Sequence, residues 1–114
     1  MYQDLGERLL KFAVDVLKFL KTIPRSIEND VIKYQLSKCS TSIGANYEES
    51  QGALSKADFY HKIKISLKES RETKYWFLII KYSNLGDQVE LNRLLKESIE
   101  LMNILGSISA KQIK

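Results

Sequence analysis

Residues 5–20 read LGERLLKFAVDVLKFL, and this stretch decides the class of fold. Its apolar side chains return every three or four positions, which is the period of an α-helix and not that of a strand. They form one stripe that comprises Leu5, Leu9, Phe12, Val16 and Leu20. Leu10, Ala13 and Leu17 widen this stripe sideways. The sequence therefore predicts an amphipathic helix with more apolar surface than one core face requires.

Helix start and stop signals divide the rest of the chain into three further helical segments. Candidate N-caps precede all four helices, at Asp4, Ser26, Ser55 and Asp87. The first helix is expected to end at about residue 22, before Pro24, and the others to cover 27–52, 56–84 and the segment from 88 onward. With 5 Gly and 1 Pro, the chain has too few turn formers for a sandwich or a barrel. We expect one domain over residues 1–114, an all-α, antiparallel, up-down-up-down four-helix bundle.

The surplus apolar surface of residues 5–20 also bears on assembly. A small elongated bundle often covers such surface by association with further copies. We therefore expect the bundle to be oligomeric, with the chain itself as its first partner.

The composition excludes several classes of protein. Hydrophobic residues make up 44% and charged residues 28% of the chain, which is typical of a globular domain. One Cys and one His exclude a disulfide framework and a site built from several Cys or His ligands, so we expect neither a metal nor a cofactor. The longest apolar run, residues 75–80, is too short to span a bilayer, and the first residues show no signal peptide. We expect a cytoplasmic protein without a membrane partner.

Enzymatic motifs are missing from the sequence. It contains no Gly-rich phosphate loop, nucleophile elbow or HExxH pattern. Cys39 belongs to the apolar stripe of the second helix, so a core position is a better interpretation than a nucleophile. The sequence predicts a protein that is not an enzyme.

Polar residues interrupt the apolar pattern of the second and third helices. One strip of the second helix combines Gln35, Ser42, Asn46 and Glu49, and small hydroxyl residues with Glu69 at their edge line the facing side of the third. The first interpretation is a structural polar seam that fixes the register of the helices. One alternative is a binding pocket or subunit contact at Asn46 and Glu49. Another is a carboxylate metal site formed by Glu49, Glu69 and Glu72.

Positive charge is concentrated in the third helix. Residues 56–84 carry seven Lys or Arg against three acids, whereas the whole chain has a net charge of +4 and a pI near 9.1. Lys64, Lys68 and Arg71 form a stripe opposite the core face, and Lys74 extends it. One interpretation is a solvated helix face. The other is contact with the phosphates of RNA or DNA.

Two segments of the chain resemble a known family. Residues 35–49, which contain STSIGAN at 40–46, resemble its central motif, and SKADFYHKIKISLKESRETKYW at 55–76 resembles its second block. The family comprises bacterial four-helix-bundle proteins encoded in intervening sequences of 23S rRNA genes and formerly labelled ribosomal proteins. The accessory variability determinant of diversity-generating retroelements is similar to the same group. Glu48 and Ser50 depart from the family's pattern, where smaller residues are usual.

The resemblance implies a homopentamer with a central pore and possible nucleic-acid binding through basic faces, and it implies no catalytic activity. Together with the basic stripe, it leads us to expect an oligomer that binds RNA or DNA without strong sequence specificity. The alternative is a protein-interaction scaffold, whose partner docks on the oligomer and which has no direct nucleic-acid role.

Overall fold

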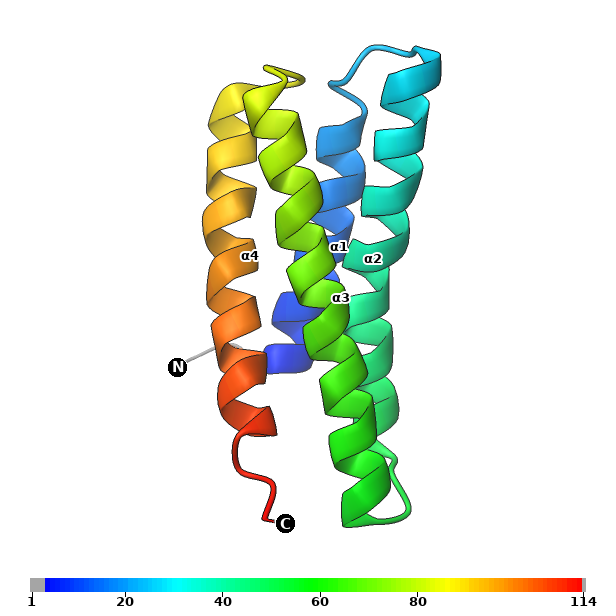
Figure 1. Ribbon diagram of the computed structural model, residues 1–114, viewed down its shortest axis with the longest axis vertical. Coiled ribbons are helices and arrows are strands. Elements are labelled where there is room, and N and C mark those ends of the chain that lie inside the picture. Colours follow the sequence, from blue (N-terminus) through cyan, green and yellow to red (C-terminus); the bar gives the residue numbers. More distant parts are fainter. Residues whose placement is uncertain (1–3, 114) are drawn as a thin grey trace.

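The computed structural model describes residues 4–113. Within them the chain forms four helices and no strand: α1 (Leu5–Leu20), α2 (Ile27–Gln51), α3 (Lys56–Tyr82) and α4 (Gln88–Ser109). The helices lie side by side, and the connections between successive helices lie at alternate ends of the molecule (Figure 1). The molecule measures 44 × 33 × 20 Å, so it is elongated along the helices. In this described part, no helix is both long and apolar enough to cross a membrane.

Three of the four expected N-caps are confirmed. The hydroxyls of Ser26 and Ser55 each accept a hydrogen bond at 3.0 Å from the backbone N–H three residues later. The Asp87 carboxylate accepts two such bonds at the start of α4, at 3.1 and 3.2 Å. Asp4 makes no capping bond with its side chain. Its backbone carbonyl instead accepts from the N–H of Arg8 at 3.0 Å, so the backbone alone begins α1.

The turn between α3 and α4 rests on the end of α1. Gly86 has a φ of +74°, and an added Cβ there would lie 2.9 Å from Thr22 Oγ1. The same Thr22 oxygen accepts a hydrogen bond from the N–H of Asp87 at 3.0 Å. Only glycine combines this backbone conformation with so close an approach. The turn therefore fixes where α4 starts relative to α1.

All four helices contribute to one hydrophobic core. The rings of Phe12 and Phe19 on α1 both contact Phe77 on α3, with centroids 6.3 and 6.2 Å apart. Burying an aromatic or aliphatic side chain of this size contributes about 1.5–3 kcal/mol. The core also includes Leu9, Val16, Leu36, Cys39, Ile43, Leu67, Ile80, Leu91, Leu94, Leu101 and Leu105. The stripe predicted for residues 5–20 supplies Leu9, Phe12, Val16 and Leu20 of this core.

Small residues let α2 and α3 pack closely. Ser66, Ser70 and Thr73 are buried on α3, on the side where the sequence places them. The Ser66 hydroxyl donates across the contact to the carbonyl of Ile43 at 2.7 Å. Ser70 and Thr73 donate to carbonyls of their own helix at 2.6 and 2.8 Å. Each of these hydroxyls is thus satisfied, so burial does not leave a polar group unpaired.

Charged side chains join α1 to α4. Arg8 donates two hydrogen bonds to the Glu97 carboxylate at 2.8 and 2.7 Å and a third to Glu100 at 3.0 Å. Four residues before Glu97 in α4, Arg93 bonds Asp15 of α1 at 3.0 Å. The bond from Arg8 outweighs the effect of burial and lowers the pKa of the Glu97 carboxyl. This contact therefore depends on the ionised state of its acids.

Candidate nucleic-acid interface

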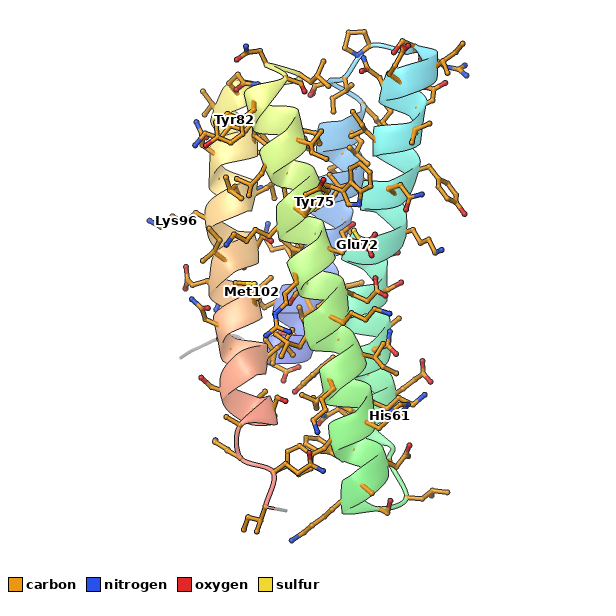
Figure 2. The ribbon with its side chains drawn as sticks, in the orientation of Figure 1. His61, Glu72, Tyr75, Tyr82, Lys96 and Met102 are labelled. Atoms are coloured by element: carbon orange, nitrogen blue, oxygen red, sulfur yellow. The ribbon has the colours of Figure 1, made fainter. Side chains whose placement is uncertain are left out.

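The outer face of α3 carries the four predicted phosphate-binding residues. Lys64, Lys68 and Arg71 are exposed, and Lys74 is half-buried on the side of α4. His61 and Tyr75 lie on the same outer surface and are labelled in Figure 2. The structure thus places the four cations along one helix face, as their spacing predicts.

These cations lack acidic partners in the described part of the chain. No carboxylate of residues 4–113 lies within ion-pair distance of any of the four. Lys64 donates instead to the amide oxygen of Gln112. On the inner edge of the same helix, Lys62 does form an ion pair, with Glu49 of α2 at 3.1 Å. Positive charge therefore accumulates on the outer face and is neutralised towards α2.

The predicted polar strip of α2 bonds mainly within its own helix. Ser42 donates to the carbonyl of Lys38 at 2.7 Å, and Asn46 donates to the carbonyl of Ser42 at 2.9 Å. Gln35 is half-buried, whereas Glu49 is exposed and bonded to Lys62. The buried hydroxyls of α2 belong to Ser40 and Ser50, which lie outside the predicted strip. A structural role for the strip stays a prediction.

Glu69 of α3, at the edge of the predicted polar seam, has a carboxyl with a perturbed pKa. Burial raises the pKa of its carboxyl, and the neighbouring carboxylate of Glu72 raises it further. Glu72 in turn accepts a hydrogen bond from the indole of Trp76 at 3.2 Å. Across residues 4–113, the structure gathers no group of three or more His, Cys, Asp or Glu side chains that could hold a metal ion.

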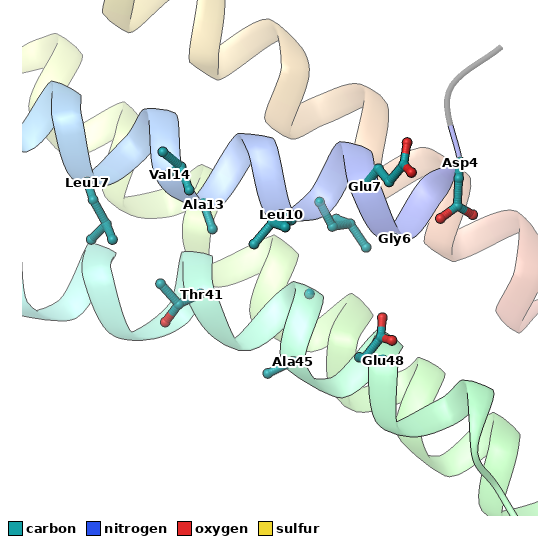
Figure 3. Close-up of a pocket in the computed structure, with 12 residues that line it drawn as sticks. Asp4, Gly6, Glu7, Leu10, Ala13, Val14, Leu17, Thr41, Ala45 and Glu48 are labelled. Carbon is teal, nitrogen blue, oxygen red and sulfur yellow. The ribbon is translucent and has the colours of Figure 1, made fainter. Parts of the chain in front are cut away.

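A groove between α1 and α2 exposes the surplus apolar surface of α1. Leu10, Val14 and Leu17 remain 66%, 41% and 43% exposed along it. Figure 3 shows these side chains on α1 opposite Thr41, Ala45 and Glu48 of α2. The groove has a volume of about 650 Å³. Gly44 is one of its lining residues, and a Cβ added there would lie 3.4 Å from the Cβ of Leu9. Its acidic residues are Asp4, Glu7 and Glu48.

Comparison with known proteins identifies the family of this chain. Residues 4–107 match the family model described as 23S rRNA-intervening sequence protein. The chain belongs to this family. The match confirms the resemblance carried by residues 35–49 and 55–76, and it covers nearly the whole chain. No curated protein is significantly similar to this family member.

A solved structure with a similar fold supports this family assignment. It is a protein with unknown function from the S23 ribosomal protein family of Bacteroides thetaiotaomicron VPI-5482. The two chains share 33% sequence identity with a TM-score of 0.82, over 96% of this chain and 100% of the other. The helical arrangement is therefore shared within the family, and the neighbour's description assigns no activity.

Two features of the basic outer face of α3 were not predicted from the sequence. The first is a pair of exposed tyrosines on α3, Tyr75 and Tyr82, whose side chains are 60% and 79% exposed. Their seven-residue spacing, which corresponds to about two helical turns, is the signal that could have linked them. The second feature is the contribution of α4, whose Met102 lies next to Arg71. Helical spacing within one segment contains no information about such a neighbour.

Proposed function

We propose that this chain is a non-enzymatic, cytoplasmic protein that binds RNA or DNA through the outer face of α3. The observation that carries the proposal is the set of cations on that face, Lys64, Lys68, Arg71 and Lys74, none of which has a carboxylate at ion-pair distance within residues 4–113. Cations in such positions attract the phosphate backbone, which is the main source of nucleic-acid affinity. Phosphates are the same in every sequence, so binding is without strong sequence specificity.

The contrast with other cations of the molecule supports this choice. Arg8 and Arg93 each bond two acidic residues between α1 and α4 or within α4. A cation held by carboxylates has less charge to offer a ligand, because the pair already neutralises it. Unlike these paired arginines, the positive side chains along the outer face of α3 are open to a phosphate backbone.

Self-association is the second part of the proposal. The antiparallel up-down-up-down bundle assembles into a homo-oligomer through the groove between α1 and α2. Covering the exposed leucines of this groove with a second copy removes apolar surface from water, which is favourable. The family resemblance implies a pentamer. Five copies with a net charge of +4 each carry about +20 together, and several basic faces on one particle strengthen binding to one long nucleic acid.

The test removes the charge of the α3 face. Lys64→Gln, Lys68→Gln and Arg71→Gln are combined, and binding to unrelated RNA and duplex DNA is measured by fluorescence anisotropy over a range of salt concentrations. We expect weaker binding to both. We also expect the logarithm of the binding constant to depend less steeply on salt, by up to about 0.9 per lost phosphate contact on DNA. Oligomer mass is expected to stay unchanged.

A matched control changes the same amount of charge elsewhere. Lys18→Gln, Lys21→Gln and Lys96→Gln remove three exposed lysines from α1, its C-terminal end and α4. This control should keep most of the affinity and the salt dependence. Absence of binding by the unmodified protein at about 50 mM salt contradicts the nucleic-acid function. Loss of the oligomer in the α3 variant would instead assign these cations to a subunit contact.

A protein-interaction scaffold is the second candidate. The observation in its favour is the same apolar groove between α1 and α2, whose acidic rim disfavours nucleic acid and suits a basic protein surface. A scaffold predicts that oligomer mass does not change on addition of RNA, and that substitutions on the α3 face have no effect on partner binding.

A further inference from the structure

A second groove follows the contact between α3 and α4 and contains both polar and apolar groups. It has two hollows, of about 340 and 470 Å³, and both are lined by Arg71 and Met102. The smaller hollow adds Lys74, Tyr75 and Leu78. Figure 2 views the molecule with Tyr75 and Met102 labelled on this side. The groove is therefore continuous with the basic face of α3 and extends it over α4.

The smaller hollow has an apolar lining and an aromatic wall. Leu78 and Met102 supply its apolar surface, and Tyr75, which is 60% exposed, supplies a ring at its edge. A flat aromatic ring beside apolar side chains is the environment in which an unpaired nucleobase stacks. A phosphate group has no favourable contact with such a surface. The hollow thus offers a contact that phosphate binding alone leaves unused.

Neighbouring residues hold Tyr75 in place. Its ring meets that of Trp76 edge to face, with centroids 5.8 Å apart and an angle of 75° between the planes. The Trp76 indole is itself fixed by its hydrogen bond of 3.2 Å to Glu72. A ring supported in this way loses little conformational freedom when a ligand stacks on it.

Two cations border the same hollow. Arg71 and Lys74 line it, and no acid of the described residues lies within ion-pair distance of either. Successive phosphates of one strand flank each base, so cations beside an aromatic wall suit a base and its own backbone together. This charge pattern favours a nucleic acid over an apolar or acidic peptide.

We infer that the groove between α3 and α4 binds single-stranded nucleic acid, with a base stacked on Tyr75 against Leu78 and Met102 and its phosphates on Arg71 and Lys74. The inference rests on the proposed function and narrows its substrate class. In a duplex the faces of the bases are covered by their neighbours, so a duplex reaches only the cations. A single strand reaches both the cations and the ring.

The test separates the ring from the charge. Tyr75→Leu removes the aromatic face, and Tyr75→Phe keeps it. Binding is measured by fluorescence anisotropy with an unstructured single-stranded oligonucleotide of about 20 nucleotides and with a duplex of the same length. We expect Tyr75→Leu to weaken single-strand binding roughly 5- to 100-fold and duplex binding less than about twofold. Tyr75→Phe should retain single-strand affinity.

Two further measurements complete the design. Tyr34→Leu removes another exposed tyrosine from α2 and should leave both affinities unchanged. Trp76 is the one tryptophan of the chain and contacts Tyr75, so its fluorescence should change on addition of the single strand and not of the duplex. Circular dichroism checks that each variant keeps its helices.

The outcomes distinguish the inference from the proposed function. Equal losses for single strand and duplex in Tyr75→Leu, or no loss in either, overturn the stacking site while phosphate binding stands. Failure of the unmodified protein to bind either ligand overturns both, and the scaffold function takes their place.

Discussion

The groove between α1 and α2 and the groove between α3 and α4 lie on one small bundle, and both expose apolar side chains. Their charged borders differ in sign. Asp4, Glu7 and Glu48 border the first groove, whereas Arg71 and Lys74 border the second. An acidic rim disfavours the approach of nucleic acid, whereas the apolar surface inside it suits contact with protein. The sign of the border therefore distinguishes the surface that we propose for assembly from the surface that we propose for a phosphate-bearing ligand.

We expect the largest effect from substitutions in the groove between α1 and α2 alone. Leu10→Glu combined with Leu17→Glu adds negative charge to an apolar surface that already has acidic neighbours, so a second copy should no longer cover it. We expect the mass from light scattering to fall to that of the 13.2 kDa chain. Affinity for a long nucleic acid should fall roughly 10²- to 10⁴-fold, because separate chains lose multivalency.

The control for this variant has the same charge change at other exposed apolar positions. Ile27→Glu with Val89→Glu should leave both mass and affinity unchanged. If the unmodified protein already has the mass of one chain, the assembly function of the first groove is wrong. A monomeric variant that keeps full affinity would show that the two grooves do not depend on each other.

A smaller effect is expected at the contact that ties α1 of the first groove to α4 of the second. Arg8→Met removes the bonds to Glu97 and Glu100 and should lower the free energy of unfolding at pH 7 by about 1–2 kcal/mol. The pKa of Glu97 is lowered in the folded protein, so its contribution is present above the ordinary pKa of a glutamate and is lost as pH falls.

Urea unfolding at pH 7 and at about pH 3 measures this dependence. The difference between the unmodified protein and Arg8→Met should shrink at the lower pH. Arg25→Met, which removes an exposed and longer ion pair of 3.5 Å, should change stability little at either pH. A difference that grows with acidity would contradict the assigned role of Glu97.

We expect the smallest effect on stability from replacing one glycine of each groove by alanine. Gly106 in α4 has no atom within 4 Å of an added Cβ, so Gly106→Ala should stabilise the helix by about 0.5–1 kcal/mol. Gly44→Ala gains the same helix propensity, but its methyl group would lie 3.4 Å from Leu9 Cβ, so we expect a smaller gain. Thermal unfolding of both variants measures the difference. A larger gain for Gly44→Ala would mean that α1 and α2 pack less closely there than described.

Local sequence signals predict the helices of this chain well. The bounds of α2 differ by one residue from the predicted 27–52, and α3 ends at Tyr82, two residues before the predicted end. The reason is physical, because helical periodicity and capping bonds act over three or four neighbouring residues. The excess apolar surface of the first helix is likewise present, at Leu10 and Leu17, since angular position on a helix follows from spacing alone.

The candidate sites are less predictable because they depend on contacts between helices. Spacing places Asn46 beside the core stripe, yet its hydrogen bond to the Ser42 carbonyl depends on a rotamer that the sequence pattern does not specify. The groove beside Arg71 depends on Met102, which comes from the following helix. Charge on the α3 face follows from the sequence, whereas the finding that no acid of residues 4–113 lies within ion-pair distance of its four cations follows only from packing.

The single cysteine of the chain has a consequence for how the protein can be studied. Cys39 is fully buried, its thiol lies 3.7 Å from the Leu36 carbonyl oxygen, and burial raises its pKa to about 11. At neutral pH almost none of it is thiolate, and an alkylating reagent reaches it only when the bundle opens. The rate at which Cys39 is alkylated therefore measures how often the core opens. Alkylation of this buried thiol therefore reports the opening of the bundle without an added probe.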